Sequence, residues 1–202
     1  KVRTTLTIGS FVVALFLFGI LAAIRMAFSF RIDVAGVDRL NVINRVSLIL
    51  PLPYSYRDRL LQIQGVAGVT YATGFSGIYQ DERNFFPQFA VDKDTWLELY
   101  SEYIIPQDQR QAFLRDRQGC LVGRSLAKRF GFKVGDRIPL KGTIWTGTWE
   151  FNVAGIYDGK RPDVDTSTMF FRYDYLEENR SFGKGTVGWY IVKLRTPDEA
   201  VT

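Results

Sequence analysis

Residues 123–136 read GRSLAKRFGFKVGD and constrain the fold more than any other segment. One face of its predicted short helix collects the apolar residues Leu126, Ala127 and Phe130. Gly131 is placed to end that helix, because glycine readily takes the left-handed conformation of a helix C-terminus. Gly135-Asp136 then predicts a tight turn into a strand over residues 137–140. A helix, a turn and a strand therefore follow one another closely here, with Gly123 at the start of the segment.

Outward from this stretch, short helices and strands alternate on both sides. Patterns of apolar and polar residues predict strands over residues 31–46, 66–75, 84–91, 119–122, 169–172 and 186–195. Helices are expected over residues 54–64, 92–100, 108–115, 125–130 and 173–179, with Asp92 or Asp94 and then Asp108 as caps. The sequence therefore predicts an α+β fold with a mixed α/β domain.

An aromatic hairpin is predicted within residues 144–157, with its turn at Thr146-Gly147. Trp145 and Trp149 would then flank the turn, where a protruding apolar tip could contact a partner or cargo. In the alternative, both tryptophans pack on their own domain. The sequence leaves these two readings open.

The N-terminal segment is apolar enough to be a membrane helix. Residues 4–24 carry no charge, and a helix of about 21 residues spans about 31 Å, the thickness of a bilayer core. We expect residues 1–26 to form one transmembrane helix; its spanning part includes Thr4, Phe11, Leu15, Phe18 and Ile24. A secretory signal peptide or a buried core helix is the alternative, and both fit the length and apolar character of the segment less well. Basic residues on both sides leave its orientation open.

The composition excludes several classes of function. The chain has 202 residues with a net charge of +5 spread along it, which does not indicate a nucleic-acid binder. It has no histidine and one cysteine, Cys120, so neither a metal site nor a histidine-activated hydrolase is expected. The segment Gly183-Lys184-Gly185 lacks the spacing and the following Ser or Thr of a phosphate-binding loop. We therefore expect no enzyme activity, no cofactor and no catalytic residue in this chain.

In order, four segments resemble the extracytoplasmic domain of the MacB/FtsX/LolC-like permeases of ABC transporters. They are residues 3–7 at the membrane entry, residues 63–69 at a helix-to-strand corner, the stretch 123–136 and residues 153–157 as a return strand. The family motif falls on Gly123, Leu126, Ala127, Phe130, Gly131, Gly135 and Asp136. The resemblance implies a membrane-proximal, porter-like subdomain (27–91 plus 151–202) and an inserted, distal Sabre-like subdomain (92–150).

The same resemblance implies a function. It predicts a fragment of a permease subunit in the bacterial inner membrane, whose periplasmic domain couples cytoplasmic ATP hydrolysis to export or mechanotransmission. The partners it implies are membrane lipid, a cytoplasmic ABC ATPase that carries the ATP, a second permease subunit and a periplasmic protein, with no nucleic acid. A single-span sensor or adaptor domain is the alternative function, and a membrane-anchored enzyme is a distant third. The transported substrate does not follow from the fold.

If the two ends of the outer domain meet the membrane together, the strands after the first helix and before the last residues should belong to one packed unit. We therefore expect the strand around residues 31–46 and the strand around residues 186–195 to lie in one subdomain. The inserted residues 92–150 are expected to project away from the membrane.

Overall fold

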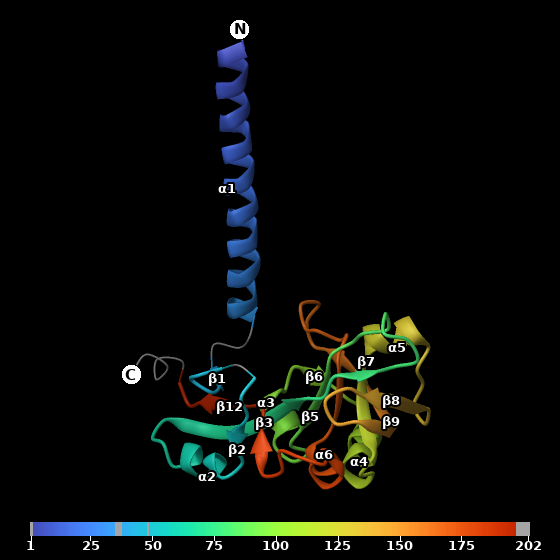
Figure 1. Cartoon of the computed structure of the whole chain (residues 1–202). Coiled ribbons are helices and arrows are strands. Elements are labelled where there is room, and N and C mark those ends of the chain that lie inside the picture. Colours follow the sequence, from blue (N-terminus) through green and yellow to red (C-terminus); the bar gives the residue numbers. More distant parts are fainter. Residues whose placement is uncertain (1, 35–37, 48, 197–202) are drawn as a thin grey trace. The chain divides into compact units, whose positions relative to one another are not determined.

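A computed structural model describes residues 2–34, 38–47 and 49–196 of the chain. The chain divides into two compact units, Lys1–Val37 and Asp38–Thr202. The first consists of one long helix and the second of an α/β domain, and each is described here by itself (Figure 1).

Helix α1 runs from Val2 to Val34 and is longer than the helix expected over residues 1–26. The strand expected from Arg31 is therefore wrong in its first residues, because residues 25–34 contain no glycine or proline that would end the helix earlier. Phe11, Leu15 and Phe18 have exposed side chains on α1, and Thr4 also lies on this helix. Within the part of the chain whose placement is described, no helix is long and apolar enough to cross a membrane.

A ten-stranded sheet forms the second unit, in the order β1-β12-β3-β5-β10-β7-β9-β8-β4, with β6 paired to β9. Two pairs of neighbours are parallel, β5 with β10 and β7 with β9. The strands are β1 Arg39–Val42, β3 Val66–Gly74, β4 Gly77–Ile78, β5 Gln88–Val91, β6 Tyr103–Ile104, β7 Gly119–Gly123, β8 Arg137–Gly142, β9 Gly147–Gly159, β10 Met169–Arg172 and β12 Trp189–Leu194. A separate two-stranded sheet joins β2, Leu52–Pro53, to β11, Thr186–Val187.

Both faces of the central strands are buried. On β10, Met169 and Phe171 enter the larger core cluster, whereas Phe170 between them enters the smaller one on the other face. This alternation follows from the two-residue period of a strand. Helices α5 and α6 contribute to the larger cluster, and α3 and α4 to the smaller. The helices are α2 Tyr56–Leu61, α3 Trp96–Leu99, α4 Gln107–Arg115, α5 Arg124–Phe130 and α6 Tyr173–Asn179.

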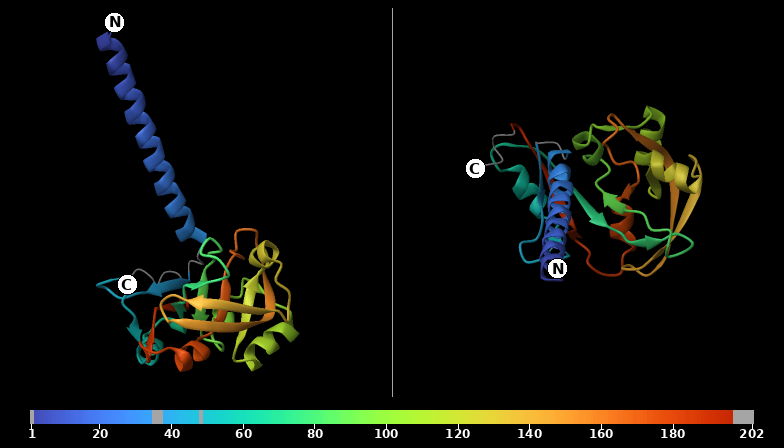
Figure 2. Two further views of the ribbon diagram at one scale, coloured as in Figure 1. Left: turned by 45° about the vertical axis from the view of Figure 1, so that its right-hand side comes forward. Right: turned by 90° about the horizontal axis from the view of Figure 1, so that it is seen from above.

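The expected hairpin is displaced in the structure. Its two arms are β8 and β9, paired from Arg137↔Asn152 to Gly142↔Gly147, and its loop comprises residues 143–146 (Figure 2, left). The turn predicted at Thr146-Gly147 is therefore wrong, and Trp145 and Trp149 do not lie on opposite arms. The apolar and polar residues alternate over only a few positions around the tryptophans. This pattern does not indicate that the preceding strand, β8, is the partner of β9. The expected helix caps also differ, since Thr95 and Pro106 hold those positions.

Pairing of β1 with β12 confirms that the strands at the two ends of the domain lie together (Figure 1). The register runs from Arg39↔Lys193 to Val42↔Tyr190, and the backbone N–H of Leu194 donates to the carbonyl of Asp38 at 2.7 Å. The predicted boundary between the two subdomains, at residues 150 and 151, falls within β9. This strand belongs to the same sheet as β3 and β12. The division into two subdomains stays a prediction.

Candidate functional site

A cavity of about 430 Å³ opens where two parallel strands end. Strands β5 and β10 are parallel neighbours with Val91 opposite Arg172, so their carboxyl ends lie at the same edge of the sheet. Ligand sites in α/β proteins concentrate at such edges. The lining comes from the residues that follow these two strands, from β3, from α2 and from two loops: Tyr54, Arg57, Tyr71, Asp92, Lys93, Asp94, Tyr173, Asp174, Glu177 and Gly185.

Pairing of β2 with β11 brings the two lining loops together. The backbone N–H of Tyr54 donates to the carbonyl of Gly185 at 2.8 Å, directly beside that small sheet. Tyr190, on β12, donates its hydroxyl to the carbonyls of Pro53 or Tyr54, at 2.7 and 2.8 Å. Burial raises the pKa of Tyr190 to about 12, so this hydroxyl keeps its proton at neutral pH. The loop before α2 is therefore fixed to the sheet at this end of the cavity.

Three aromatic rings, called here the tyrosine cluster, form one wall of the cavity: Tyr54, Tyr71 and Tyr173. Tyr71 meets the other two edge to face, with centroids 5.3 Å from Tyr54 and 4.9 Å from Tyr173. Burial raises the pKa of Tyr71 well above its usual value, and the nearby Asp92 carboxylate raises it further. The cluster therefore offers ring edges and the neutral phenol of Tyr71 to the cavity.

Glu177 and Arg180 hold the position of Tyr173. The Tyr173 hydroxyl lies 2.9 Å from Glu177 Oε2 and 2.8 Å from the carbonyl of Thr186, and it accepts a hydrogen bond from the Arg180 guanidinium at 2.9 Å. Arg180 also pairs with Glu177 and is itself 2% exposed. Burial raises the pKa of Tyr173 above its usual value, and the positive charge of Arg180 only partly offsets that rise. This network keeps the Tyr173 ring in place beside Tyr71.

Asp174 stays ionised at the cavity through its arginine partner. Burial alone would raise the pKa of this carboxyl, but hydrogen bonds and charge from Arg172 lower it below its usual value. Arg172 is in turn anchored to the carbonyl of Leu114 at 2.7 Å. Among the described residues, no group of three or more acidic, cysteine or histidine side chains could hold a metal ion, so the cavity carboxylates are not arranged as a metal centre.

The motif residues at 123–136 shape the fold rather than a cavity. A Cβ at Gly123 would lie 2.1 Å from the backbone oxygen of Thr166, so only glycine fits where β7 passes into α5. Gly131 ends α5 with φ +75°, and Gly135 (φ +93°) donates its N–H to the carbonyl of Val153 on β9 at 2.9 Å. The other members lie at the same corner: Leu126 and Ala127 are buried, Phe130 packs beside them, and Asp136 accepts from the N–H of Lys133.

Trp145 and Trp149 are 7% and 5% exposed, within the larger core cluster. Trp149 Nε1 donates to the carbonyl of Trp145 at 3.0 Å, and the Trp149 ring lies edge-to-face with Phe75. This burial fits the alternative in which both tryptophans pack on their own domain. Their contact with a partner stays an untested prediction. Cys120 is also fully buried, which raises the pKa of its thiol well above its usual value.

Sequence reasoning missed the cavity. None of its residues was singled out as a ligand-binding group, although Asp92 and Asp94 were noted as helix caps. One signal was available, because polar residues follow directly after two apolar strand segments, at residues 92–94 and 173–174. What the sequence could not show is that these two strands are parallel neighbours.

The sequence as a whole decides the family. Residues 4–201 match the MacB-like periplasmic core domain family, which is nearly the full chain. The chain belongs to this family. The resemblance carried by the four segments is thereby confirmed, and the MacB-like domain described here is the periplasmic or extracellular part of an ABC transporter permease of that family.

Solved structures share the fold of this MacB-like domain. The extracellular domain of the noncanonic ABC-type transporter YknZ from Gram-positive bacteria is 14% identical, with a TM-score of 0.55 over 81% of this chain and 85% of that one. The periplasmic region of MacB from Actinobacillus actinomycetemcomitans is 15% identical, with a TM-score of 0.57 over 79% and 75%. No curated protein matches the sequence.

Proposed function

We propose that this MacB-like domain couples ATP hydrolysis by a separate cytoplasmic ATPase to export or to movement of a periplasmic partner, as part of a dimeric permease in the bacterial inner membrane. In this proposal the uncharged segment of residues 4–24 anchors the chain in the membrane and carries movement outward. The chain itself is not an enzyme and binds no ATP. The transporter family supports the assembly with an ATPase.

The observation that carries the proposal is the pairing of β1 with β12. Asp38 follows the helix by four residues in the sequence, and its carbonyl accepts from the N–H of Leu194 near the other end of the domain. Lys193 also lies 3.7 Å from the Asp38 carboxylate. Because β12 is paired with β3 in the same sheet, a displacement applied at Asp38 would enter a densely packed unit instead of being lost in a loose linker.

The character of α1 supports the membrane part of the proposal. Residues 4–24 are uncharged, and the side chains of Phe11, Leu15 and Phe18 are each about two-thirds exposed, at 67%, 68% and 71%. An apolar surface of this extent on a single helix is unfavourable in contact with water and is stabilised by apolar surroundings. Lipid would cover all sides of such a helix.

A flexible insertion tests the coupling. Five Gly and Ser residues inserted directly before Asp38 should leave ATP hydrolysis by the assembled transporter intact while lowering transport at least about tenfold, because a flexible linker dissipates displacement. Transport and ATP hydrolysis would be measured together in proteoliposomes that contain the full permease and its ATPase.

The matched control carries the same insertion between Lys160 and Arg161, in an exposed loop that does not connect α1 to the sheet. This control should transport normally. Equal transport by both insertion variants would contradict the coupling role. The alternative function, a single-span sensor or adaptor domain, would then be the better description.

A further inference from the structure

The cavity at the ends of β5 and β10 contains two charged groups that lack an ion-pair partner among the described residues. The other four charged groups are satisfied: Lys93 pairs with Asp94 at 2.8 Å, Asp174 pairs with Arg172, and Glu177 pairs with Arg180. Arg57 and Asp92 remain. They carry opposite charges, and they reach the same cavity from α2 and from the loop after β5.

Arg57 has a donor with no acceptor. Its Nε–H is buried, and no hydrogen-bond acceptor reaches it in the described part of the chain. A buried donor without a partner lowers stability, because its hydrogen bond to water is lost and not replaced. A carboxylate is the acceptor that fits a guanidinium best, because its two oxygens match two parallel N–H groups. Arg57 lines the cavity and has no carboxylate partner among the described residues, so its guanidinium is suited to a ligand carboxylate.

Asp92 has unused acceptor capacity. It is 7% exposed, and its oxygens accept from the N–H of Asp94 at 3.2 Å and from the Thr95 hydroxyl at 2.7 Å. An ionised carboxylate can accept about four hydrogen bonds, so both oxygens keep room for further donors. Both of its present donors are neutral groups. A ligand ammonium would supply the missing positive charge.

We propose that this cavity binds a small zwitterion of dipeptide size, with its ammonium group at Asp92 and its carboxylate at Arg57. Tyr71 and Tyr173 lie on the wall of the same cavity, where their ring edges would pack against an apolar or aromatic side chain of the ligand. The volume of about 430 Å³ lies within the range of small-molecule sites. An inorganic anion would bind only to Arg57, and a polyamine would bind only to the carboxylates of the cavity.

Four probes distinguish these ligands on the full chain in detergent micelles, by isothermal titration calorimetry. They are the dipeptide alanylphenylalanine, its N-acetyl form, its C-terminal amide, and spermidine. The free dipeptide should bind, and each blocked form should bind at least about tenfold more weakly, because each loses one charge-assisted contact. Binding of both blocked forms as tightly as the free dipeptide, tighter binding of spermidine, or no binding up to about 10 mM would overturn the proposal.

Two variants assign the ends of the ligand. Arg57→Gln should remove the preference for the free dipeptide over its amide, while the preference over the N-acetyl form remains. Asp92→Asn should do the reverse. Arg59→Gln on α2 and Asp108→Asn on α4 lie outside the cavity lining and should leave both preferences unchanged.

Far-ultraviolet circular dichroism shows whether each variant is folded. If Asp92→Asn does not fold, the comparison of blocked and free dipeptides on the unchanged chain still decides the proposal. Retention of both preferences in a folded Arg57→Gln variant would overturn the assignment. The binding measurement needs no ATPase and no transport, so its result is independent of the coupling proposed above.

Discussion

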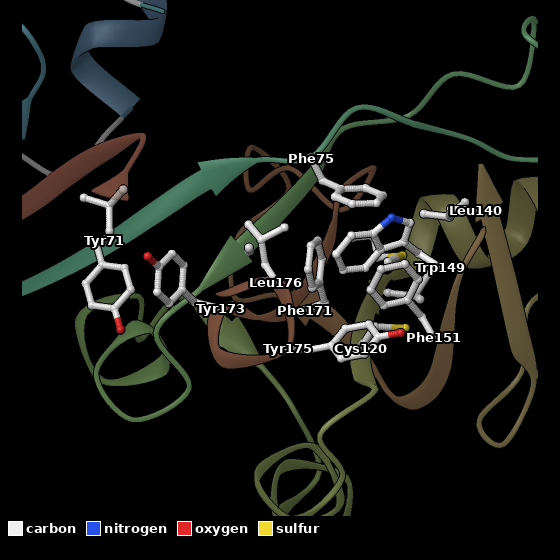
Figure 3. Packing of buried hydrophobic residues seen from close by; sticks show 14 of the residues in the cluster. Tyr71, Phe75, Cys120, Leu140, Trp149, Phe151, Phe171, Tyr173, Tyr175 and Leu176 are labelled. Carbon is white, nitrogen blue, oxygen red and sulfur yellow. The ribbon is translucent and has the colours of Figure 1, made fainter. Parts of the chain in front are cut away.

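Two groups of aromatic residues share the larger core cluster, and they differ in what surrounds their rings (Figure 3). The core aromatic cluster comprises Phe75, Trp149, Phe151, Phe171 and Tyr175, whose rings contact one another. At the other end, past Leu176, Tyr71 and Tyr173 of the tyrosine cluster lie among carboxylates and arginines. Ring packing is common to both clusters. Only the tyrosine cluster combines ring packing with charged groups and a cavity, so it is the candidate site.

Removal of a ring from the core aromatic cluster should have the largest effect on stability. Phe171 is fully buried, with centroids 5.3 Å from Phe75 and 4.7 Å from Phe151. Phe171→Ala should lower the free energy of unfolding by about 3–5 kcal/mol, because it removes apolar contacts and leaves a cavity. Urea denaturation of the full chain measures the change.

The exposed Phe182 provides the control for this comparison, since it is 56% exposed. Phe182→Ala should change the free energy of unfolding by about 0.5 kcal/mol or less. Equal losses in the two variants would mean that the core aromatic cluster is not the stabilising unit described here.

The second prediction compares two tyrosines on α6. Tyr173→Phe removes a hydroxyl that contacts Glu177, Arg180 and the carbonyl of Thr186, so it should lower the free energy of unfolding by about 1–2 kcal/mol. Tyr175→Phe, in the core aromatic cluster, removes only a 3.4 Å contact with Gln118 and should cost about 0.5 kcal/mol or less. Urea denaturation measures the free energy of unfolding of both variants. If Tyr175→Phe lowers it as much as Tyr173→Phe does, the two clusters do not differ in how much hydrogen bonds of their tyrosines stabilise the fold.

Local elements of this fold could be predicted from the sequence, but the cavity could not. The sequence predicted β3, β10 and α6 closely, because their apolar patterns and breakers are local. The hairpin turn was misplaced, since pairing of Arg137–Gly142 with β9 depends on residues beyond the Trp-Thr-Gly-Thr-Trp segment. Parallel pairing of β5 and β10 joins segments about 80 residues apart, and short-range patterns carry no information on such contacts.

Because short-range patterns carry no information on distant contacts, the family motif could be recognised in the sequence and the cavity could not. Gly123 and Gly131 lie within one short segment, and the glycine itself marks each position: Gly123 lies against the backbone of Thr166, and Gly131 has a positive φ. Arg57, Asp92 and Tyr173 come from three distant segments. Each of them, seen alone, is an ordinary surface or core residue, and only the sheet order brings them to one cavity.

The smallest expected effect concerns a charge at the cavity and appears only as a dependence on pH. Arg172 lowers the pKa of Asp174 in the folded chain below its usual value of about 4, although burial opposes this shift. A carboxyl whose folded pKa is depressed stabilises the fold above the unfolded pKa, and this contribution is lost as the pH falls through the folded pKa. Asp174→Asn should therefore lower the free energy of unfolding by about 1 kcal/mol or less at pH 7, since the side chain is 37% exposed and its attraction is screened.

As the pH falls through the folded pKa of Asp174, the stabilities of Asp174→Asn and of the unchanged chain should converge, because the native carboxyl then becomes protonated as well. Urea denaturation at several pH values between 2 and 7 follows the convergence of the two curves. Asp108→Asn, at an exposed position on α4 away from the cavity, shows the effect of removing a carboxylate that does not line it. If the Asp174→Asn difference is as large at pH 2 as at pH 7, the shape of the side chain and not its charge holds Arg172. The cavity would then differ from the core aromatic cluster in polarity but not in its response to pH.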